Sequence, residues 1–416
     1  MVVPEAAWAG ERERVLEFPE ACDVKLYPMN GYEEAPVSRN RIIYALRNPI
    51  GSKPLRELAR GREEVAIVFD DITRPTHVRE LAEAVLAELM AAGVKGDNIR
   101  FIAALGAHRA MTREEFVKKL GADIVESYPV YNHDPFFSCE YLGETSYGTP
   151  VEVNGEYASC DLKIGIGCIV PHPMVGFGGG AKILLPGIAS IDAIKHNHGV
   201  VGGYAHGSKP HPSTGWGKWE NNVMKKDAEE FAEIAGLHFN IDVIINGFND
   251  SIEVYAGNFV SGHRAGVERA RELYSSETPT DYDVMILNTS AKANEAAVAL
   301  SNWYPFLKRG SIVVLIANPP DGQVTHYVLG KFGKKIGGAL YTPPRRLDKI
   351  KKLIIYSEHP ERDPHLPIAR NEEVYLVKNW EEVIEELVSA GSRIRVAVIP
   401  NAEIQCPSEV LKASNR

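Results

Sequence analysis

Residues 162–187, LKIGIGCIVPHPMVGFGGGAKILLPG, join an apolar run to a loop that is rich in glycine. The run 162–170 is typical of a buried strand, and the glycines after it allow the backbone to turn through positive φ. A loop at the carboxyl end of a strand lies where open α/β sheets bind their ligands. The stretch therefore predicts an α/β fold with a ligand site at this loop, to which His172, Lys182 and the downstream His198 add reactive groups.

The glycine loop matches neither of the two common nucleotide-binding motifs. The Walker motif requires Gly-Lys-Ser/Thr, and the dinucleotide motif requires G-x-G-x-x-G within a βαβ unit. The sequence places Gly-Ala before Lys182 and Ile183 after it. An ordinary nucleotide-binding protein is therefore not indicated, although a nest of backbone amides at the loop could still bind an anion.

Composition describes an ordinary globular chain of 416 residues, with 44% hydrophobic and 24% charged residues and a net charge of −9. This length predicts two domains. The negative charge argues against a nucleic acid or an anionic membrane as partner, and we interpret the basic residues at 349–352 as a solvated helical face. No apolar stretch reaches the length of a membrane span or resembles a signal peptide, so a cytoplasmic location is expected. The five cysteines show no C-x-x-C spacing and are expected to be reduced.

Strand and helix patterns alternate along most of the chain. Residues 64–69 predict a strand and 78–89 a helix, and strand 99–105 precedes a helix opened by a capping box from Thr112 to Glu115. We predict two α/β domains with largely parallel sheets, 1–275 for cofactor binding and catalysis and 276–416 as a C-terminal domain, with the active site in the crevice between them. Whether the last residues return to the first domain is left open.

Polar side chains follow the strands of the first domain, where each strand is expected to end. They are Asp71, Arg74, His108, His172, Lys182 and His198. Two histidines on separate loops suit an acid/base pair, because imidazole titrates near neutral pH. The planar guanidinium of an arginine suits a substrate carboxylate. A histidine metal site is possible, but no H-E-x-x-H or other zinc spacing is present.

Four motifs together carry a resemblance to a known family. They are DDITRPT at 70–76, GAHRAMT at 106–112, NHD at 132–134 and PHPMVGFGGGAKILLPG at 171–187, followed by His198. In this order and at these intervals they resemble the nickel-dependent lactate racemase family. The resemblance covers most of residues 60–275 and is weaker beyond them. It implies an isomerase that racemises or epimerises a 2-hydroxy acid by hydride abstraction and return.

The resemblance also implies a cofactor, the nickel-pincer nucleotide, which is a pyridinium-3-thioamide-5-thiocarboxylic acid mononucleotide that holds Ni(II). Lys182 matches the lysine that binds it covalently, and His198 matches the histidine that ligates nickel beside sulfur and carbon donors. Soft sulfur donors with one imidazole suit this metal. The glycines Gly178, Gly179 and Gly180 would lie near its phosphate. Cofactor-maturation enzymes are the partners that such a group implies.

The same resemblance assigns the chemistry of the substrate. His108 and His172 match the two acid/base histidines, and Asp71 matches a contact to the ribose of the cofactor. Arg74 matches an anchor for cofactor or substrate. Together with Lys292 it is the expected substrate-binding pair.

One departure from the family concerns the substrate. Members that act on lactate carry a glutamine and a lysine three residues apart in the helix that opens the second domain, whereas this chain has Asn294-Glu295-Ala296-Ala297, with Lys292 just upstream. The sequence therefore predicts a 2-hydroxy acid other than lactate. A hydride-transfer dehydrogenase, a metal-dependent hydrolase and a non-catalytic cofactor-binding protein stay open as alternatives. The oligomeric state is not predicted.

Overall fold

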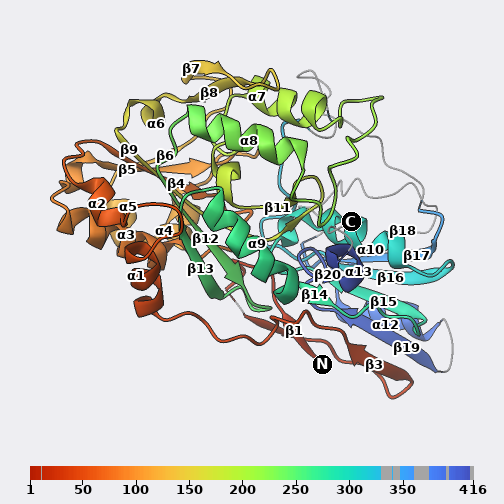
Figure 1. The fold of residues 1–416 in the computed structure, drawn as a ribbon. Coiled ribbons are helices and arrows are strands. Elements are labelled where there is room, and N and C mark those ends of the chain that lie inside the picture. The colour runs from red at the N-terminus through yellow and green to blue at the C-terminus, as the bar shows by residue number, and fades with distance from the viewer. Residues whose placement is uncertain (11, 329–339, 341–346, 360–373, 390–392, 413–416) are drawn as a thin grey trace.

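The computed structural model describes residues 1–416 except 11, 329–339, 341–346, 360–373, 390–392 and 413–416. Two six-stranded sheets organise the chain, and helices cover both of them (Figure 1). The predicted α/β fold with largely parallel sheets is confirmed. Among the described residues, no helix is both long enough and apolar enough to cross a lipid bilayer.

The first sheet forms the larger core. In spatial order its strands are β13 (Ser251–Gly257), β12 (Phe239–Ile245), β9 (Leu162–Cys168), β4 (Val65–Asp70), β5 (Ile99–Ala104) and β6 (Val130–Asn132). Neighbours are parallel except β12 and β13. Along β4 the buried side chains alternate, so that Val65 and Ile67 join one core cluster and Ala66 and Val68 the other. This alternation is the two-residue period of a strand that is buried on both faces.

Helices lie on both faces of this sheet. Those that pack into the first core cluster are α1 (Arg39–Arg47), α2 (Leu55–Ala59), α3 (Val78–Ala91), α4 (Arg113–Leu120), α5 (Ala122–Ser127) and α9 (Ser261–Leu273). The opposite face is covered by α6 (Gly155–Ser159), α7 (Ile191–Lys195) and α8 (Val223–Ile234). The predicted capping box is present, because Thr112 Oγ1 accepts the Glu115 N–H and Glu115 accepts the Thr112 N–H. The alternation of strands and helices along the chain thus produces one sheet with a layer of helices on each face.

The second sheet is parallel throughout. Its order is β18 (Val374–Val377), β17 (Ile350–Tyr356), β16 (Ser311–Ile316), β15 (Val284–Asn288), β19 (Ile394–Ile399) and β3 (Cys22–Leu26). The helical interpretation of 349–352 is wrong, because residues 350–352 begin strand β17. The apolar run 353–356 that follows pairs with buried β16, and this pairing outweighs the local preference of the lysines.

Both ends of the chain connect the two sheets. The N-terminal strand β3 lies beside β19 in the second sheet, at the lower right of Figure 1, so this sheet is not confined to residues 276–416. Near the C-terminus, β20 (Cys406–Pro407) pairs with β14 (Ser275–Ser276), and Leu411 of α13 (Ser408–Lys412) packs into the first core. The Arg271 guanidinium also donates to the Leu411 carbonyl at 2.8 Å. These contacts hold the two sheets in one fixed arrangement.

The remaining elements are short. The strands are β1 (Val2–Pro4), β2 (Glu13–Val15), β7 (Cys139–Glu144), β8 (Pro150–Asn154), β10 (Pro171–His172) and β11 (Gly176–Phe177). The α-helices are α10 (Ala297–Trp303) and α12 (Trp380–Val388). The 3-10 turns are η1 (Gly96–Asn98), η2 (Gly180–Ile183), η4 (Ala293–Glu295) and η5 (Tyr304–Phe306). The elements η4, α10 and η5 follow one another as three short helical segments. After α7 the chain winds into a π-helix, η3 (His196–Val201).

Candidate active site

A cavity of about 220 Å³ lies between the carboxyl ends of the two sheets. Loops after β4, β5 and β9 line it from the first sheet, and the loop after β15 lines it from the second. The expected site residues found on its wall are Asp71, Arg74, His108, His172, Gly178, Gly179, Lys182, His198 and Lys292. Gly180 follows Gly179 in the same loop but does not line the cavity. Residues predicted from separate motifs thus meet at one place, as the carboxyl-end rule for α/β sheets requires.

His108 is held by Asp71. Its Nδ1 lies 2.7 Å from Asp71 Oδ2, and the other oxygen of that carboxylate accepts the N–H of Thr73 at 3.1 Å. Burial by itself raises the pKa of Asp71, but the charge and hydrogen bond of His108 outweigh it and lower that pKa. An ionised carboxylate at Nδ1 stabilises the tautomer with the proton on that nitrogen. The unprotonated Nε2 then faces the cavity and can accept a proton.

His172 has the opposite tautomer. Its Nδ1 accepts the N–H of Met174 at 3.2 Å, so in the neutral ring the proton is on Nε2, which lies 2.9 Å from Lys182 Nζ. Burial, followed by the charge of Lys182, lowers the pKa of His172 well below its usual range. Burial, followed by the charge of Arg74, likewise lowers the pKa of Lys182. Burial thus favours the neutral form of both groups, and in its neutral form the Lys182 amine can accept the hydrogen bond of His172 Nε2.

His198 is presented by the π-helix η3. Its Nδ1 lies 3.1 Å from the carbonyl of Ile194, which leaves Nε2 directed to the cavity, and burial lowers its pKa to about 3. The buried carboxylate of Asp227 secures the turn, because Asn197 donates to it at 2.8 Å. Thr149 also donates to Asp227, at 2.7 Å. π-turns are rare and often mark functional sites, and this one turns a neutral imidazole toward the cavity.

The glycine loop is shaped by a buried network beneath it. Gly179 and Gly180 have φ of 79° and 59°, and a Cβ on Gly180 would lie 2.9 Å from His263. The N–H of Gly180 donates to Asp242 at 2.8 Å, while Lys225 donates to the Gly179 carbonyl at 2.6 Å. The Gly178 N–H is also bonded, to the Val170 carbonyl at 2.8 Å. Two of the three amides are therefore engaged within the protein, and the glycines mainly allow a tight turn.

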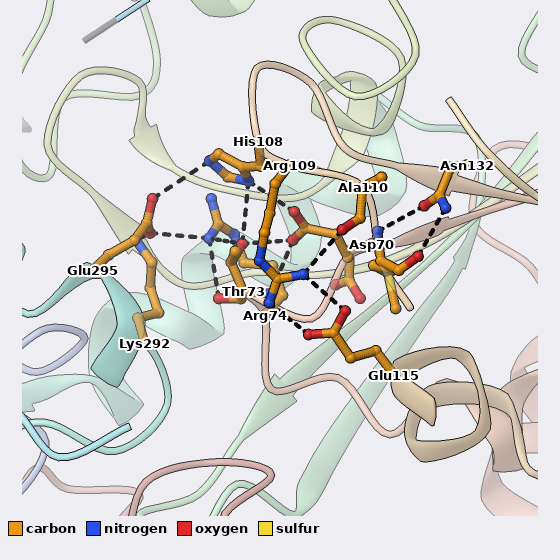
Figure 2. Close-up of polar contacts among 12 residues, drawn as sticks. Asp70, Thr73, Arg74, His108, Arg109, Ala110, Glu115, Asn132, Lys292 and Glu295 are labelled. Atoms are coloured by element: carbon orange, nitrogen blue, oxygen red, sulfur yellow. Dashed lines mark hydrogen bonds and ion pairs between the residues drawn. The ribbon is translucent and has the colours of Figure 1, made fainter. Parts of the chain in front are cut away.

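Arg74 and Lys292 share one carboxylate. Glu295 Oε2 lies 3.0 Å from Arg74 Nη1 and 2.8 Å from Lys292 Nζ, and Glu295 Oε1 lies 3.7 Å from His108 Nε2. Figure 2 shows Glu295 facing Arg74 and His108 across the site. Burial by itself raises the pKa of Glu295, but the charges of Lys292 and Arg74 outweigh it and hold that pKa well below its usual range. The expected substrate-binding pair is therefore already bridged by an ionised side chain.

Sequence reasoning missed His326. This residue lies on the cavity wall, its ring centroid is 5.2 Å from that of His108, and burial lowers its pKa to about 3. The Tyr327 N–H donates to the Ala107 carbonyl at 2.7 Å, so this part of the second domain is fixed to the loop after β5. A lone histidine after a segment of prolines and glycine carries no sequence signal that would have identified it.

The cavity fits a metal-containing organic group better than a bare metal ion. Within the described ranges, no three His, Cys, Asp or Glu side chains come together as a complete metal site. His198 supplies a single neutral imidazole, which is the form that binds a metal. Burial lowers the pKa of Lys182 well below its usual range, which favours the neutral amine that can be joined covalently to a carbonyl or thiocarbonyl carbon. These donors suit a group that brings its remaining metal ligands with it.

Comparison with known proteins finds relatives of this chain. Residues 9–207 match the lactate racemase N-terminal domain family. The lactate racemase of Thermoanaerobacterium thermosaccharolyticum is 30% identical over 304 residues, which are 71% of this chain and 68% of that protein. The lactate racemase of Lactiplantibacillus plantarum is 32% identical over 286 residues, 67% of this chain and 66% of that protein.

Solved structures show the same fold over nearly the whole chain. The lactate racemase apoprotein from T. thermosaccharolyticum superposes with a TM-score of 0.70 at 23% identity, covering 97% of this chain and 98% of that one. A protein from Thermotoga maritima gives 0.64 at 18% identity, covering 90% of this chain and 99% of that one. With the sequence match to its N-terminal domain and to two of its enzymes, the chain belongs to the lactate racemase family.

Proposed function

We propose that this protein is a racemase or epimerase of a 2-hydroxy acid that works with a nickel-pincer nucleotide attached to Lys182. One observation carries the proposal: a buried lysine, a free histidine nitrogen and two histidines of opposite tautomer face one cavity. Lactate racemases are its relatives at about a third identity. When bound, the cofactor would accept the hydrogen of the substrate Cα with its electron pair and give it back.

The residues of the chain provide attachment and proton transfer. His198 Nε2 would complete the coordination of nickel, and Lys182 would hold the organic part by its covalent bond. His108 Nε2, the ring nitrogen that is not bonded to Asp71, would accept the proton of the substrate hydroxyl as Cα becomes planar. His172, which also lines the cavity and carries its proton on Nε2, would donate that proton to the keto oxygen as the hydrogen returns to the other face of Cα, and the two histidines would exchange these roles for the opposite enantiomer.

The tethering step accounts for the state of Lys182. Its amine lies 2.9 Å from His172 Nε2 and, when neutral, can accept a hydrogen bond from this nitrogen. An amide-like bond to Lys182 would remove that acceptor, which frees the His172 N–H to face the cavity. Loading the cofactor would therefore also release the second acid/base group for catalysis.

Lactate is a poor candidate substrate. Glu295 neutralises part of the charge that Arg74 and Lys292 would offer to a small monocarboxylate. Lactate has no group beyond its methyl that could interact with this carboxylate. We expect a larger 2-hydroxy acid to give a higher kcat/KM than lactate, and turnover of lactate at the highest rate in a panel of 2-hydroxy acids would contradict this.

An isotope experiment tests the reaction type. A single enantiomer of the best substrate, deuterated at Cα, is incubated with enzyme matured in a host that makes the cofactor. We expect the opposite enantiomer to form with the deuterium retained, because the same hydrogen returns to the other face. Exchange of deuterium with water would indicate proton abstraction, and accumulation of the keto acid would indicate a dehydrogenase. Either result would overturn the proposal.

A further inference from the structure

Glu295 lies on the wall of the cavity between the two sheets. It is the last residue of the 3-10 turn η4, and its N–H donates to the Lys292 carbonyl at 2.8 Å, which sets both side chains on the same side of the turn. The next N–H, of Ala296, donates to Gln323 Oε1 at 3.0 Å. The backbone that carries Glu295 is therefore fixed, and its carboxylate reaches the cavity from a rigid base.

The two oxygens of this carboxylate have different surroundings. Oε2 contacts both Lys292 Nζ at 2.8 Å and Arg74 Nη1 at 3.0 Å. Oε1 faces His108 Nε2 at 3.7 Å, which is beyond hydrogen-bond distance. One oxygen is thus committed to ion pairs, while the other retains its capacity to accept a hydrogen bond from a ligand.

Charge decides which ligands this arrangement accepts. Glu295 already pairs with both Arg74 and Lys292, so these two side chains can pair with one substrate carboxylate at most. A second carboxylate in a cavity of about 220 Å³ would lie close to Glu295, and like charges in a partly buried site repel each other. A cationic substituent would be repelled by Arg74 and Lys292 instead. A neutral hydroxyl is the remaining donor that can satisfy Oε1.

A ligand that lacks a donor is also disfavoured. A saturated or aromatic substituent would remove water from Oε1 without replacing its hydrogen bond, and an unsatisfied buried acceptor is costly. Sites built around a substrate hydroxyl discriminate strongly against analogues without it for this reason.

We propose that Glu295 is the specificity-determining residue of this site, and that it selects 2-hydroxy acids with one carboxylate and a further hydroxyl beyond C2 over dicarboxylic and purely hydrocarbon 2-hydroxy acids. This inference rests on the proposed function, because it concerns the substrate of that same cavity.

The experiment compares three acids that differ only at the end of the chain. They are 2,4-dihydroxybutanoate with a terminal hydroxyl, malate with a carboxylate and 2-hydroxypentanoate with a methyl group. Racemisation by the matured enzyme is followed by chiral chromatography. Binding to the protein before cofactor attachment is measured by calorimetry. We expect kcat/KM for the dihydroxy acid to exceed both others by at least about tenfold. Equal or better turnover of malate or 2-hydroxypentanoate would overturn the inference.

The variant Glu295→Gln removes the charge and keeps the shape. We expect kcat/KM for malate to rise at least about tenfold relative to that for the dihydroxy acid, since repulsion is lost while an acceptor oxygen is kept. Glu358→Gln is the matched control, because Glu358 pairs with Arg14 outside the cavity. We expect no change in preference there. A folded Glu295→Gln protein with an unchanged preference would overturn the inference, and if it does not fold, the wild-type series decides.

The two measurements separate the inference from the function on which it rests. If the calorimetric order is as expected but none of the acids is racemised, the proposed reaction fails and the role of Glu295 in ligand selection stands. If the acids are racemised without preference for the hydroxyl, the reaction stands and the role of Glu295 fails.

Discussion

His108 Nδ1 lies 2.7 Å from Asp71 Oδ2, and this contact determines which nitrogen of the imidazole faces the cavity. Asp71 is buried and its carboxylate is also bonded to the Thr73 N–H, so it cannot rotate away. A histidine held in this way is an oriented base, whereas a free one would distribute its proton between both nitrogens.

Replacing Asp71 by asparagine tests this orientation. The Asp71→Asn side chain can offer an N–H to Nδ1 and so favour the wrong tautomer of His108. We expect kcat to fall by roughly 10²- to 10⁴-fold with a small change in KM. Steady-state racemisation on matured enzyme measures it, with Asp192→Asn, an exposed carboxylate paired to Lys195, as control. Equal kcat values for the two variants would argue against an oriented base at His108.

The lowered pKa of Lys182 predicts unusual reactivity. Cyanate modifies neutral amines, and burial holds the pKa of Lys182 well below its usual range. In protein lacking cofactor we expect Lys182 to be carbamylated near pH 7 at least about tenfold faster than Lys226, an exposed lysine of α8, because each pKa unit changes the neutral fraction tenfold. Peptide mass spectrometry after timed exposure gives both rates. Slower reaction at Lys182 would show that its amine is charged or closed off from the cavity.

Asp227 is predicted to position the metal ligand without touching the metal. It accepts hydrogen bonds from Thr145, Thr149 and Asn197 in a fully buried site. We expect Asp227→Asn to lower the free energy of unfolding by about 2 kcal/mol, since a charged acceptor with three donors is lost. We also expect about 10- to 100-fold weaker nickel retention, because the π-helix that presents His198 loses its anchor.

Denaturant unfolding and nickel release to a chelator measure these two effects. Glu229→Gln on the same helix is the control, as Glu229 pairs only loosely, at 3.5 Å, with Arg264 on the surface. Nickel retention equal to wild type in folded Asp227→Asn would exclude the positioning role.

Buried neutral histidines predict a loss of stability in acid. Burial lowers the pKa of His198 and His326 to about 3 and that of His133 to about 4. The unfolded chain binds protons at these side chains below about pH 6.5, whereas the folded chain does not until about pH 3 to 4. Stability is therefore full above pH 6.5 and decreases as the pH falls, by up to about 2 kcal/mol for each histidine between pH 6.5 and pH 5.

Denaturant unfolding of the cofactor-free protein at several pH values checks this dependence. His133 bonds to the Ala189 carbonyl away from the cavity, so His133→Asn changes the titration without changing the site. We expect this variant to show a shallower decrease with falling pH. A decrease as steep as that of the wild type would mean that His133 is not held neutral by burial.

The sequence predicted those parts of the fold and site that depend on local pattern. The strand–loop boundaries at Asp71, His108 and His172 follow from apolar runs that end in polar or glycine residues, and parallel strands bring such ends together. The capping box at Thr112 is local in the same sense.

Features that depend on packing between distant segments could not be read from the sequence. Strand β3 belongs to the second sheet because it pairs with the edge of β19, which lies more than 300 residues later in the chain. The strand at 350–356 required the neighbouring β16 to override its lysines. Glu295 was visible as a departure from the family, but its contact with Arg74 across the two sheets was not. His326 likewise lies next to His108 in the structure, and no sequence pattern connects these two residues.

The most direct test of the account is mass spectrometry of the protein purified from a host that makes the nickel-pincer nucleotide. Intact mass, metal analysis and peptide mapping are carried out on the same active sample. The account predicts one nickel per chain and an added mass on the peptide that contains Lys182, both lost in Lys182→Ala. Full racemase activity from protein that holds neither nickel nor an adduct at Lys182 would contradict it.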